Sequence, residues 1–137
     1  TDRLQLFANI GWLETEVDTI TTFDLDQWQF VSKSGREHSK SPRYQYNAGL
    51  RAMLPWGLSG TLELEGRDRS FFGYYHDGKL DAYDLLNAQL AWSSDRVTVS
   101  LWGRNLTDEE YETRGFGGAS VIPGRPLSVS LRLEVRP

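Results

Sequence analysis

The chain of 137 residues contains no cysteine, so it offers neither a disulfide framework nor a thiolate metal site. It also has no excess of basic charge: its net charge is -4 and no run of lysine or arginine occurs, which argues against nucleic-acid binding. The mean hydropathy is -0.50, and no apolar run approaches the roughly 18 residues of a spanning helix, which excludes a helical membrane protein. A transmembrane β-strand needs only about 9–11 residues, half of them apolar, and is not excluded.

Motifs of enzymes are absent as well. No nucleophile elbow, glycine-rich phosphate loop or HExxH sequence occurs. The two histidines, His38 and His76, fall in different loops, where we expect them to be solvated rather than to share a metal ion. Glu63 and Glu65 lie on one face of a predicted strand, about 7 Å apart, but no pocket is indicated around them. The sequence therefore predicts no enzymatic activity, no cofactor and no bound metal.

Six stretches alternate apolar and polar residues, and this period of two is typical of strands with two chemically different faces. In residues 127–135, leucine and valine occupy one face, and serine, arginine and glutamate occupy the other. The predicted strands cover residues 2–13, 43–54, 58–67, 84–92, 96–105 and 127–135. The fold class is thus all-β, an antiparallel up-and-down meander of about six strands. Six strands are too few to close a barrel of this kind, so we expect a segment of a larger transmembrane β-barrel.

The connections alternate between short and long. Residues 55–57 and 93–95 form tight turns, whereas residues 14–42, 68–83 and 106–125 form long loops. Antiparallel order places both short turns at one edge of the sheet and all three long loops at the other, as in bacterial outer-membrane barrels. Within the loops, we expect residues 19–31 to extend a hairpin beyond the wall and residues 107–112 to form one helical turn.

Alternation alone does not say whether the apolar face meets lipid or packs inside a soluble barrel. Two features favour lipid. The only lysines, Lys33, Lys40 and Lys79, fall in loops, although a soluble sheet commonly carries lysine on its wet face. Aromatic residues gather near both strand ends, as in interfacial belts. The belt candidates are Trp12, Tyr44 and Tyr46 at the long-loop edge and Trp56 and Trp92 at the short-turn edge.

In this interpretation the polar face lines a pore. The lumen-facing candidates are Arg51, Glu63, Glu65, Arg67, Trp102, Arg104 and Arg132. We expect the two glutamates to pair with Arg51 or Arg67. A slip by one residue would turn arginines and glutamates toward lipid at a cost on the order of 10 kcal/mol, which fixes the register. Phe7 and Trp102 point to the polar side, either because they pack on something inside the barrel or because the phase differs locally.

The segment LWGRNLTDEEY, residues 101–111, carries an Asn-Leu-x-Asp-x-x-Tyr pattern at Asn105, Leu106, Asp108 and Tyr111. This pattern resembles the end of the next-to-last strand in TonB-dependent outer-membrane receptors, and residues 123–126 before the last strand look like the same family's ending. The resemblance implies that residues 1–137 are the last six strands of a 22-stranded barrel in the bacterial cell outer membrane. We expect Asn105 and Asp108 to satisfy backbone groups where the strand leaves the sheet, and Tyr111 to anchor the loop at the interface.

The same resemblance implies active uptake of a scarce nutrient, such as a ferric siderophore or cobalamin. In such receptors an N-terminal plug fills the barrel and a TonB-contacting segment couples release to the inner membrane. Both segments are expected to lie outside these residues. The implied partners are outer-membrane lipid, the plug and the remaining strands, TonB through the full receptor, and the transported small molecule. The alternative is a soluble β-barrel carrier of a small apolar ligand, which needs the leucine face inside and about eight or more strands.

Overall fold

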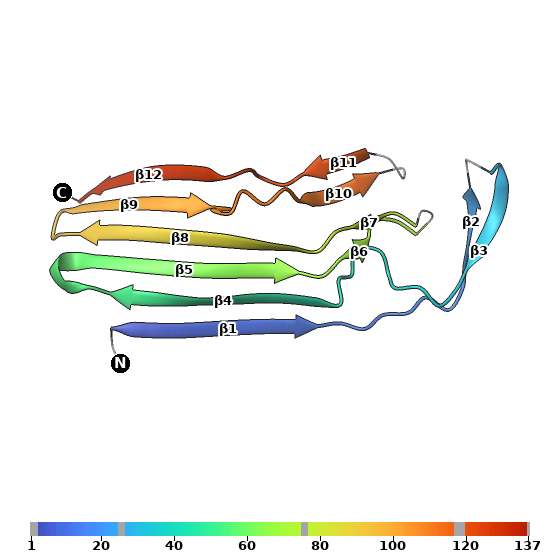
Figure 1. Ribbon diagram of the computed structural model, residues 1–137, viewed down its shortest axis with the longest axis horizontal. Coiled ribbons are helices and arrows are strands. Elements are labelled where there is room, and N and C mark those ends of the chain that lie inside the picture. Colours follow the sequence, from blue (N-terminus) through green and yellow to red (C-terminus); the bar gives the residue numbers. More distant parts are fainter. Residues whose placement is uncertain (1–2, 25–26, 75–76, 117–119, 137) are drawn as a thin grey trace.

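The computed structural model describes residues 3–24, 27–74, 77–116 and 120–136. Its main element is one six-stranded antiparallel sheet with the strand order β1-β4-β5-β8-β9-β12 (Figure 1). The strands are β1 (Leu4–Trp12), β4 (Tyr44–Met53), β5 (Leu58–Arg67), β8 (Tyr83–Ser93), β9 (Val97–Arg104) and β12 (Ser128–Val135). The predicted all-β meander of six strands is confirmed, and the predicted strand ends agree closely with these bounds.

The ladders keep chemically similar side chains together on each face of the sheet. Leu50 is paired with Leu6 on one neighbouring strand and with Leu62 on the other. Farther along the same face, Leu101 is paired with Leu131. No register shift interrupts the described ladders of this sheet. A residue's position in its strand therefore fixes its face, as a period of two requires.

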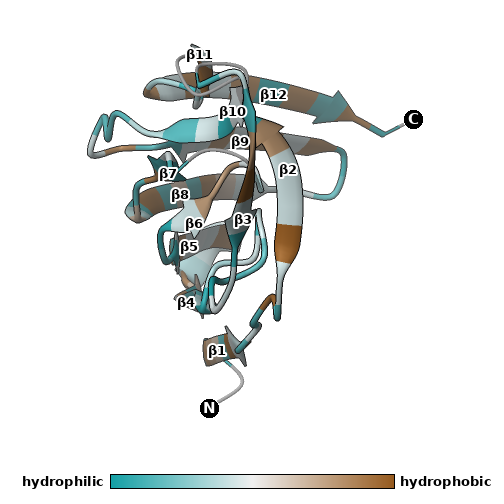
Figure 2. Cartoon of the chain, turned by 90° about the vertical axis from the view of Figure 1, so that its right-hand side faces the viewer, coloured by the Kyte–Doolittle hydropathy of each residue, from teal (hydrophilic) through white to brown (hydrophobic). Residues whose placement is uncertain are grey.

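The sheet is curved, and β1 and β12 lie at the two ends of the arc (Figure 2). In the central strands the apolar face is the more exposed one. Leu62 is 41% and Leu90 50% exposed, whereas Leu85 and Ser100, on the opposite face, are each 7% exposed. The polar face therefore lies on the concave side and the leucine face on the convex side. No helix in the described part of the chain is both long enough and apolar enough to cross a membrane.

Three two-stranded hairpins occupy the long loops. β2 (Ile20–Asp24) pairs with β3 (Gln29–Lys33), and this hairpin stands crosswise beyond the long-loop edge of the main sheet (Figure 1). β6 (Ser70–Phe71) pairs with β7 (Lys79–Leu80), and β10 (Glu112–Phe116) pairs with β11 (Ser120–Pro123). The hairpin expected within residues 19–31 is present, although as a separate small sheet. The other two hairpins were not predicted.

The tight turn predicted at residues 55–57 is present, whereas the helical turn predicted at residues 107–112 is wrong. The short 3-10 segment η1 (Pro55–Gly57) reverses the chain, and a Cβ on Gly57, whose φ is 75°, would come within 2.1 Å of Ser93 O. Residues 107–112, by contrast, form no helical turn. Asn105 and Asp108 have φ angles of 50° and 51°, and the Asp108 N–H donates to Asn105 O at 2.9 Å. These left-handed residues break the regular backbone and turn the chain toward β10.

Candidate functional site

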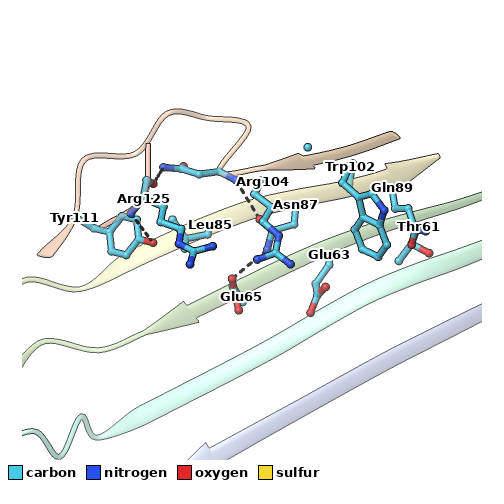
Figure 3. Close-up of a pocket in the computed structure, with 13 residues that line it drawn as sticks. Thr61, Glu63, Glu65, Leu85, Asn87, Gln89, Trp102, Arg104, Tyr111 and Arg125 are labelled. Atoms are coloured by element: carbon cyan, nitrogen blue, oxygen red, sulfur yellow. Dashed lines mark hydrogen bonds between the residues drawn. The ribbon is translucent and has the colours of Figure 1, made fainter. Parts of the chain in front are cut away.

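A ladder of polar side chains crosses the concave face. Glu63 accepts a hydrogen bond from Asn47 Nδ2 on β4. Glu65 Oε1 accepts one from Asn87 Nδ2 on β8 at 3.0 Å (Figure 3). Each glutamate thus bonds diagonally to an asparagine of a neighbouring strand, which is within reach for side chains on one face of a sheet.

This arrangement corrects the expected pairing of Glu63 and Glu65 with Arg51 or Arg67. Among the residues that the structure describes, neither glutamate forms a salt bridge with either arginine. Neutral amides stand beside the carboxylates instead, and the Arg67 guanidinium lies over the ring of Tyr83, with 5.1 Å from Cζ to the ring centroid. The sequence could not settle this choice because both partner types share the polar face.

Asn105 holds the turn that follows β9 and is only 3% exposed. Its Oδ1 accepts a hydrogen bond from the backbone N–H of Glu109 at 2.9 Å. Its Nδ2 donates to Glu109 O at 2.9 Å and to Arg125 O at 3.1 Å. The backbone N–H of Asn105 donates to Asn87 Oδ1 at 3.1 Å. One side chain therefore joins the turn to the segment before β12, and the same residue is joined to the polar ladder.

The other motif residues make contacts around this turn. Asp108 Oδ1 accepts a hydrogen bond from the backbone N–H of Leu127 at 3.0 Å. Tyr111 Oη accepts one from the backbone N–H of Arg125 at 3.3 Å. The Leu106 N–H donates to the backbone of β8 at 2.8 Å. The side chains of Asp108 and Tyr111 thus accept hydrogen bonds from backbone N–H groups, and the Leu106 backbone donates one. All three bonds lie where the chain leaves and rejoins the sheet.

The turn and the polar ladder border a cleft of about 280 Å³ on the concave face (Figure 3). Glu63 and Glu65 contribute negative charge to its lining, and Arg104 and Arg125 contribute positive charge. Trp102 provides an apolar wall. A site of this kind binds polar groups through hydrogen bonds and ion pairs, with the indole as a stacking surface.

A second cleft of about 470 Å³ lies toward the long-loop end. Arg67 and Tyr83 line it, together with Gln45, Asn47 and Tyr111. The rings of Tyr83 and Tyr111 are 4.3 Å apart between centroids. In the sequence Tyr83 belongs to the aromatic residues toward the long-loop edge, and its position one residue before an alternating stretch could also have placed it on this face.

Phe7 and Trp102 lie on the polar face without any break in the alternation. Phe7 packs over Gly49, where a Cβ would come within 2.6 Å of the phenyl ring. Trp102 lines the first cleft. Of the two explanations left open, packing on the concave side is the one that the ladders support.

The aromatic belt candidates lie near the two ends of the leucine face. At the long-loop edge Trp12 and Tyr44 stack with ring centroids 6.3 Å apart, and Tyr46 Oη donates to the Asp84 carboxylate at 2.5 Å. At the short-turn edge Trp92 Nε1 donates to Trp56 O at 3.1 Å. Trp12 is 71% and Trp56 86% exposed, so both present apolar rings to the surroundings.

The remaining candidates lie apart from the two clefts. The Arg132 side chain is 70% exposed and is 3.5 Å from Glu134, and Arg51 is exposed on β4. His38 Nδ1 lies 3.0 Å from Tyr74 Oη, whereas His76 is outside the described residues. Within the described ranges, no group of three metal-binding side chains occurs.

Comparisons with known proteins bear on the fold. No family model matches the sequence. The structure is similar to the siderophore receptor PiuA from Acinetobacter baumannii, with a TM-score of 0.87 and 14% sequence identity. The match covers 98% of this chain and 20% of the receptor chain, so this chain spans about a fifth of that protein's length. The sheet has the fold of a segment of that receptor.

Proposed function

We propose that residues 1–137 form the C-terminal part of the barrel wall of an outer-membrane active-transport receptor for a scarce nutrient, such as a ferric siderophore or cobalamin. One observation carries the proposal: the leucine and valine face is convex and exposed, while the polar face is concave and more shielded. This order suits a wall with lipid outside and a water-lined pore inside. The likeness to PiuA and the Asn-Leu-x-Asp-x-x-Tyr pattern support it.

The dimensions of the strands fit a bilayer. β4 and β5 are each 10 residues long, or about 30 Å at roughly 3.3 Å per residue. A tilt of roughly 40° reduces this to about 23 Å along the membrane normal, close to the apolar band of about 25 Å around such barrels. The exposed Trp12 and Trp56 would then lie near the two membrane interfaces.

The partners follow from the same proposal. The outer edges of β1 and β12 carry no neighbouring strand among the described residues, and unpaired backbone groups are not tolerated in lipid. The remaining strands of the full barrel would cover both edges. A plug would occupy the concave side, TonB would act through it, and the small nutrient would pass along the polar face. Asn105, Asp108 and Tyr111 would have the structural role of fixing the last loop to the wall.

The alternative, a soluble carrier, fits the structure less well. It needs the leucine face to line a closed interior. In the described part of the chain the buried apolar side chains are Phe72, Leu80, Leu85 and Ala91, and none of them belongs to the leucine face.

A cysteine scan of β12 in the full-length protein tests the proposal. Because this chain has no cysteine, spin labels can be placed at single positions once any other cysteines are removed. In outer-membrane vesicles, labels at Leu131 and Leu133 should be relaxed by oxygen, which concentrates in lipid. Labels at Ser130 and Arg132 should respond to a water-soluble nickel chelate instead.

The alternation of the two responses is the decisive readout. A soluble barrel with leucines inside would shield Leu131 and Leu133 from both reagents. That result, or equal nickel access at all four positions, would contradict the proposal. Recovery of the full-length protein from the soluble fraction would contradict it independently.

A further inference from the structure

Arg67 has hydrogen-bond donors without an acceptor. Its Nε and Nη2 are buried from solvent, and neither has a hydrogen-bond partner. Nε and Nη2 carry N–H groups that point the same way, along one edge of the planar guanidinium. This is the edge that receives a carboxylate through two parallel hydrogen bonds. An unmet buried donor is costly, so its presence marks a missing acceptor.

One oxygen of the nearest acid on this face is directed elsewhere. The closest acid on the same face of β5 is Glu65, about 7 Å away along the strand, and its Oε1 accepts from Asn87. The guanidinium lies instead over the ring of Tyr83. The Tyr83 ring packs against Tyr111, which keeps the aromatic surface below Arg67 in place.

The space for an acceptor is present. Arg67 lines the second cleft, of about 470 Å³, on the concave face at the long-loop end. The unpaired edge is itself buried, so a rotation about the last bonds of the long side chain is needed to turn it toward the cleft. Glu65 contributes negative charge to the same lining, so removing that charge favours an incoming anion.

We propose that Arg67 binds a carboxylate that enters this cleft from outside the sheet. The carboxylate belongs either to a solute in the pore or to an acidic side chain of another segment of the full-length protein. The inference rests on the proposed function in one respect, since the concave side must be open to pore contents. It differs from the expectation that Arg67 is paired within the wall.

The test uses the full-length protein purified in detergent and the variants Arg67→Gln, Arg67→Lys, Glu65→Gln and Arg51→Gln. Arg51→Gln is the matched control, because it removes the same charge from the same face about 20 Å away along the strands. Citrate is the soluble probe, its uncharged trimethyl ester the control ligand, and calorimetric titration the readout. Protease cleavage of the segment upstream of residue 1 is measured in parallel.

If the carboxylate comes from a solute, citrate binds the unmodified protein and the ester does not. Arg67→Gln then weakens citrate binding by roughly tenfold or more, as expected for loss of a charge-assisted pair. Arg67→Lys keeps the charge but loses the two-pronged geometry, so it recovers only part of the affinity. Glu65→Gln leaves binding unchanged or strengthens it, because it removes a neighbouring negative charge.

If the carboxylate comes from another segment, citrate does not bind, and Arg67→Gln speeds cleavage of the upstream segment while Arg51→Gln does not. Two results would overturn the proposal. One is that Arg67→Gln behaves like Arg51→Gln in both assays. The other is that Glu65→Gln reproduces the effects of Arg67→Gln, which would mean that the two residues serve each other. Both readouts use purified protein, so such a failure leaves the outer-membrane proposal to its own vesicle test.

Discussion

An arginine at the middle of the leucine face should be strongly destabilising. Leu62 lies near the centre of β5, about 13 Å along the strand from Leu58 at the short-turn end. Arginine facing lipid at the bilayer midplane costs about 2–4 kcal/mol, and about 0–1 kcal/mol near an interface. Leu62→Arg should therefore lower the free energy of unfolding by about 2–4 kcal/mol, and Leu58→Arg by about 1 kcal/mol or less. Gln89→Arg, one level away on the concave face of β8, should be nearly neutral.

The assay is guanidinium unfolding of the full-length protein in phospholipid vesicles, followed by tryptophan fluorescence. At about 1.4 kcal/mol per factor of ten, the Leu62→Arg change amounts to a roughly 30- to 700-fold shift in the folding equilibrium. If water covered this face, Leu62→Arg would be a surface substitution with an effect within about 0.5 kcal/mol. A neutral Leu62→Arg, or a Gln89→Arg as damaging as Leu62→Arg, would refute the assignment of the two faces.

Two further substitutions test local packing in the same unfolding assay. Asn105→Ala leaves the carbonyls of two segments without their donor, so we expect a loss of about 2–4 kcal/mol and faster protease cleavage after β9. The exposed Thr107→Ala should change stability by less than about 0.5 kcal/mol, and equal effects of the two variants would show that Asn105 does not hold the turn. Gly49→Ala places a methyl group within 2.4 Å of Leu62 O and 2.6 Å of the Phe7 ring, and should cost about 1–3 kcal/mol. Adding Phe7→Leu should restore little, because the backbone oxygen cannot move away; full restoration would assign the clash to the ring alone.

The main sheet was predictable because each strand repeats the alternation of apolar and polar residues along its length. Residues 58–67 were predicted as a strand and form β5 with the same bounds, since five levels of alternation agree. The short hairpins β6–β7 and β10–β11 carry no such repeat. Both hairpins contact Phe72, which follows β6: a Cβ at Gly78 would come within 2.3 Å of this ring and a Cβ at Gly115 within 2.4 Å. The contact with Gly115 joins residues far apart in the chain, so a local sequence pattern does not predict it.

The sequence predicts on which face of the sheet each site residue lies, but not its hydrogen-bond partner. Alternation placed Glu65, Arg67 and Trp102 on one side of the sheet, and the ladders place them there. Alternation could not identify Asn87 as the partner of Glu65, because the asparagine and arginine side chains alternate with the same period and lie on the same face. The predicted helical turn at residues 107–112 was wrong for a related reason. Thr107 with Glu110 three residues on suits a capped helical turn, whereas the left-handed Asn105 and its buried hydrogen bonds hold the chain in a different conformation.

The leucine face raises a question of free energy that the sheet alone does not answer. Sixteen of its large apolar side chains are between 37% and 75% exposed. They are Leu4, Leu6, Ile10, Trp12, Leu50, Leu54, Leu62, Leu64, Leu90, Trp92, Leu101, Leu127, Val129, Leu131, Leu133 and Val135. Burying a full side chain of this kind contributes roughly 1.5–3 kcal/mol, so covering about half of each contributes on the order of 15–20 kcal/mol in total. This free energy exceeds the net stability of most domains. A cover is therefore required, and it must be apolar along the whole arc from β1 to β12. A folded partner would have to match a convex surface of this extent, whereas acyl chains conform to it without any complementary shape, which is why we favour lipid.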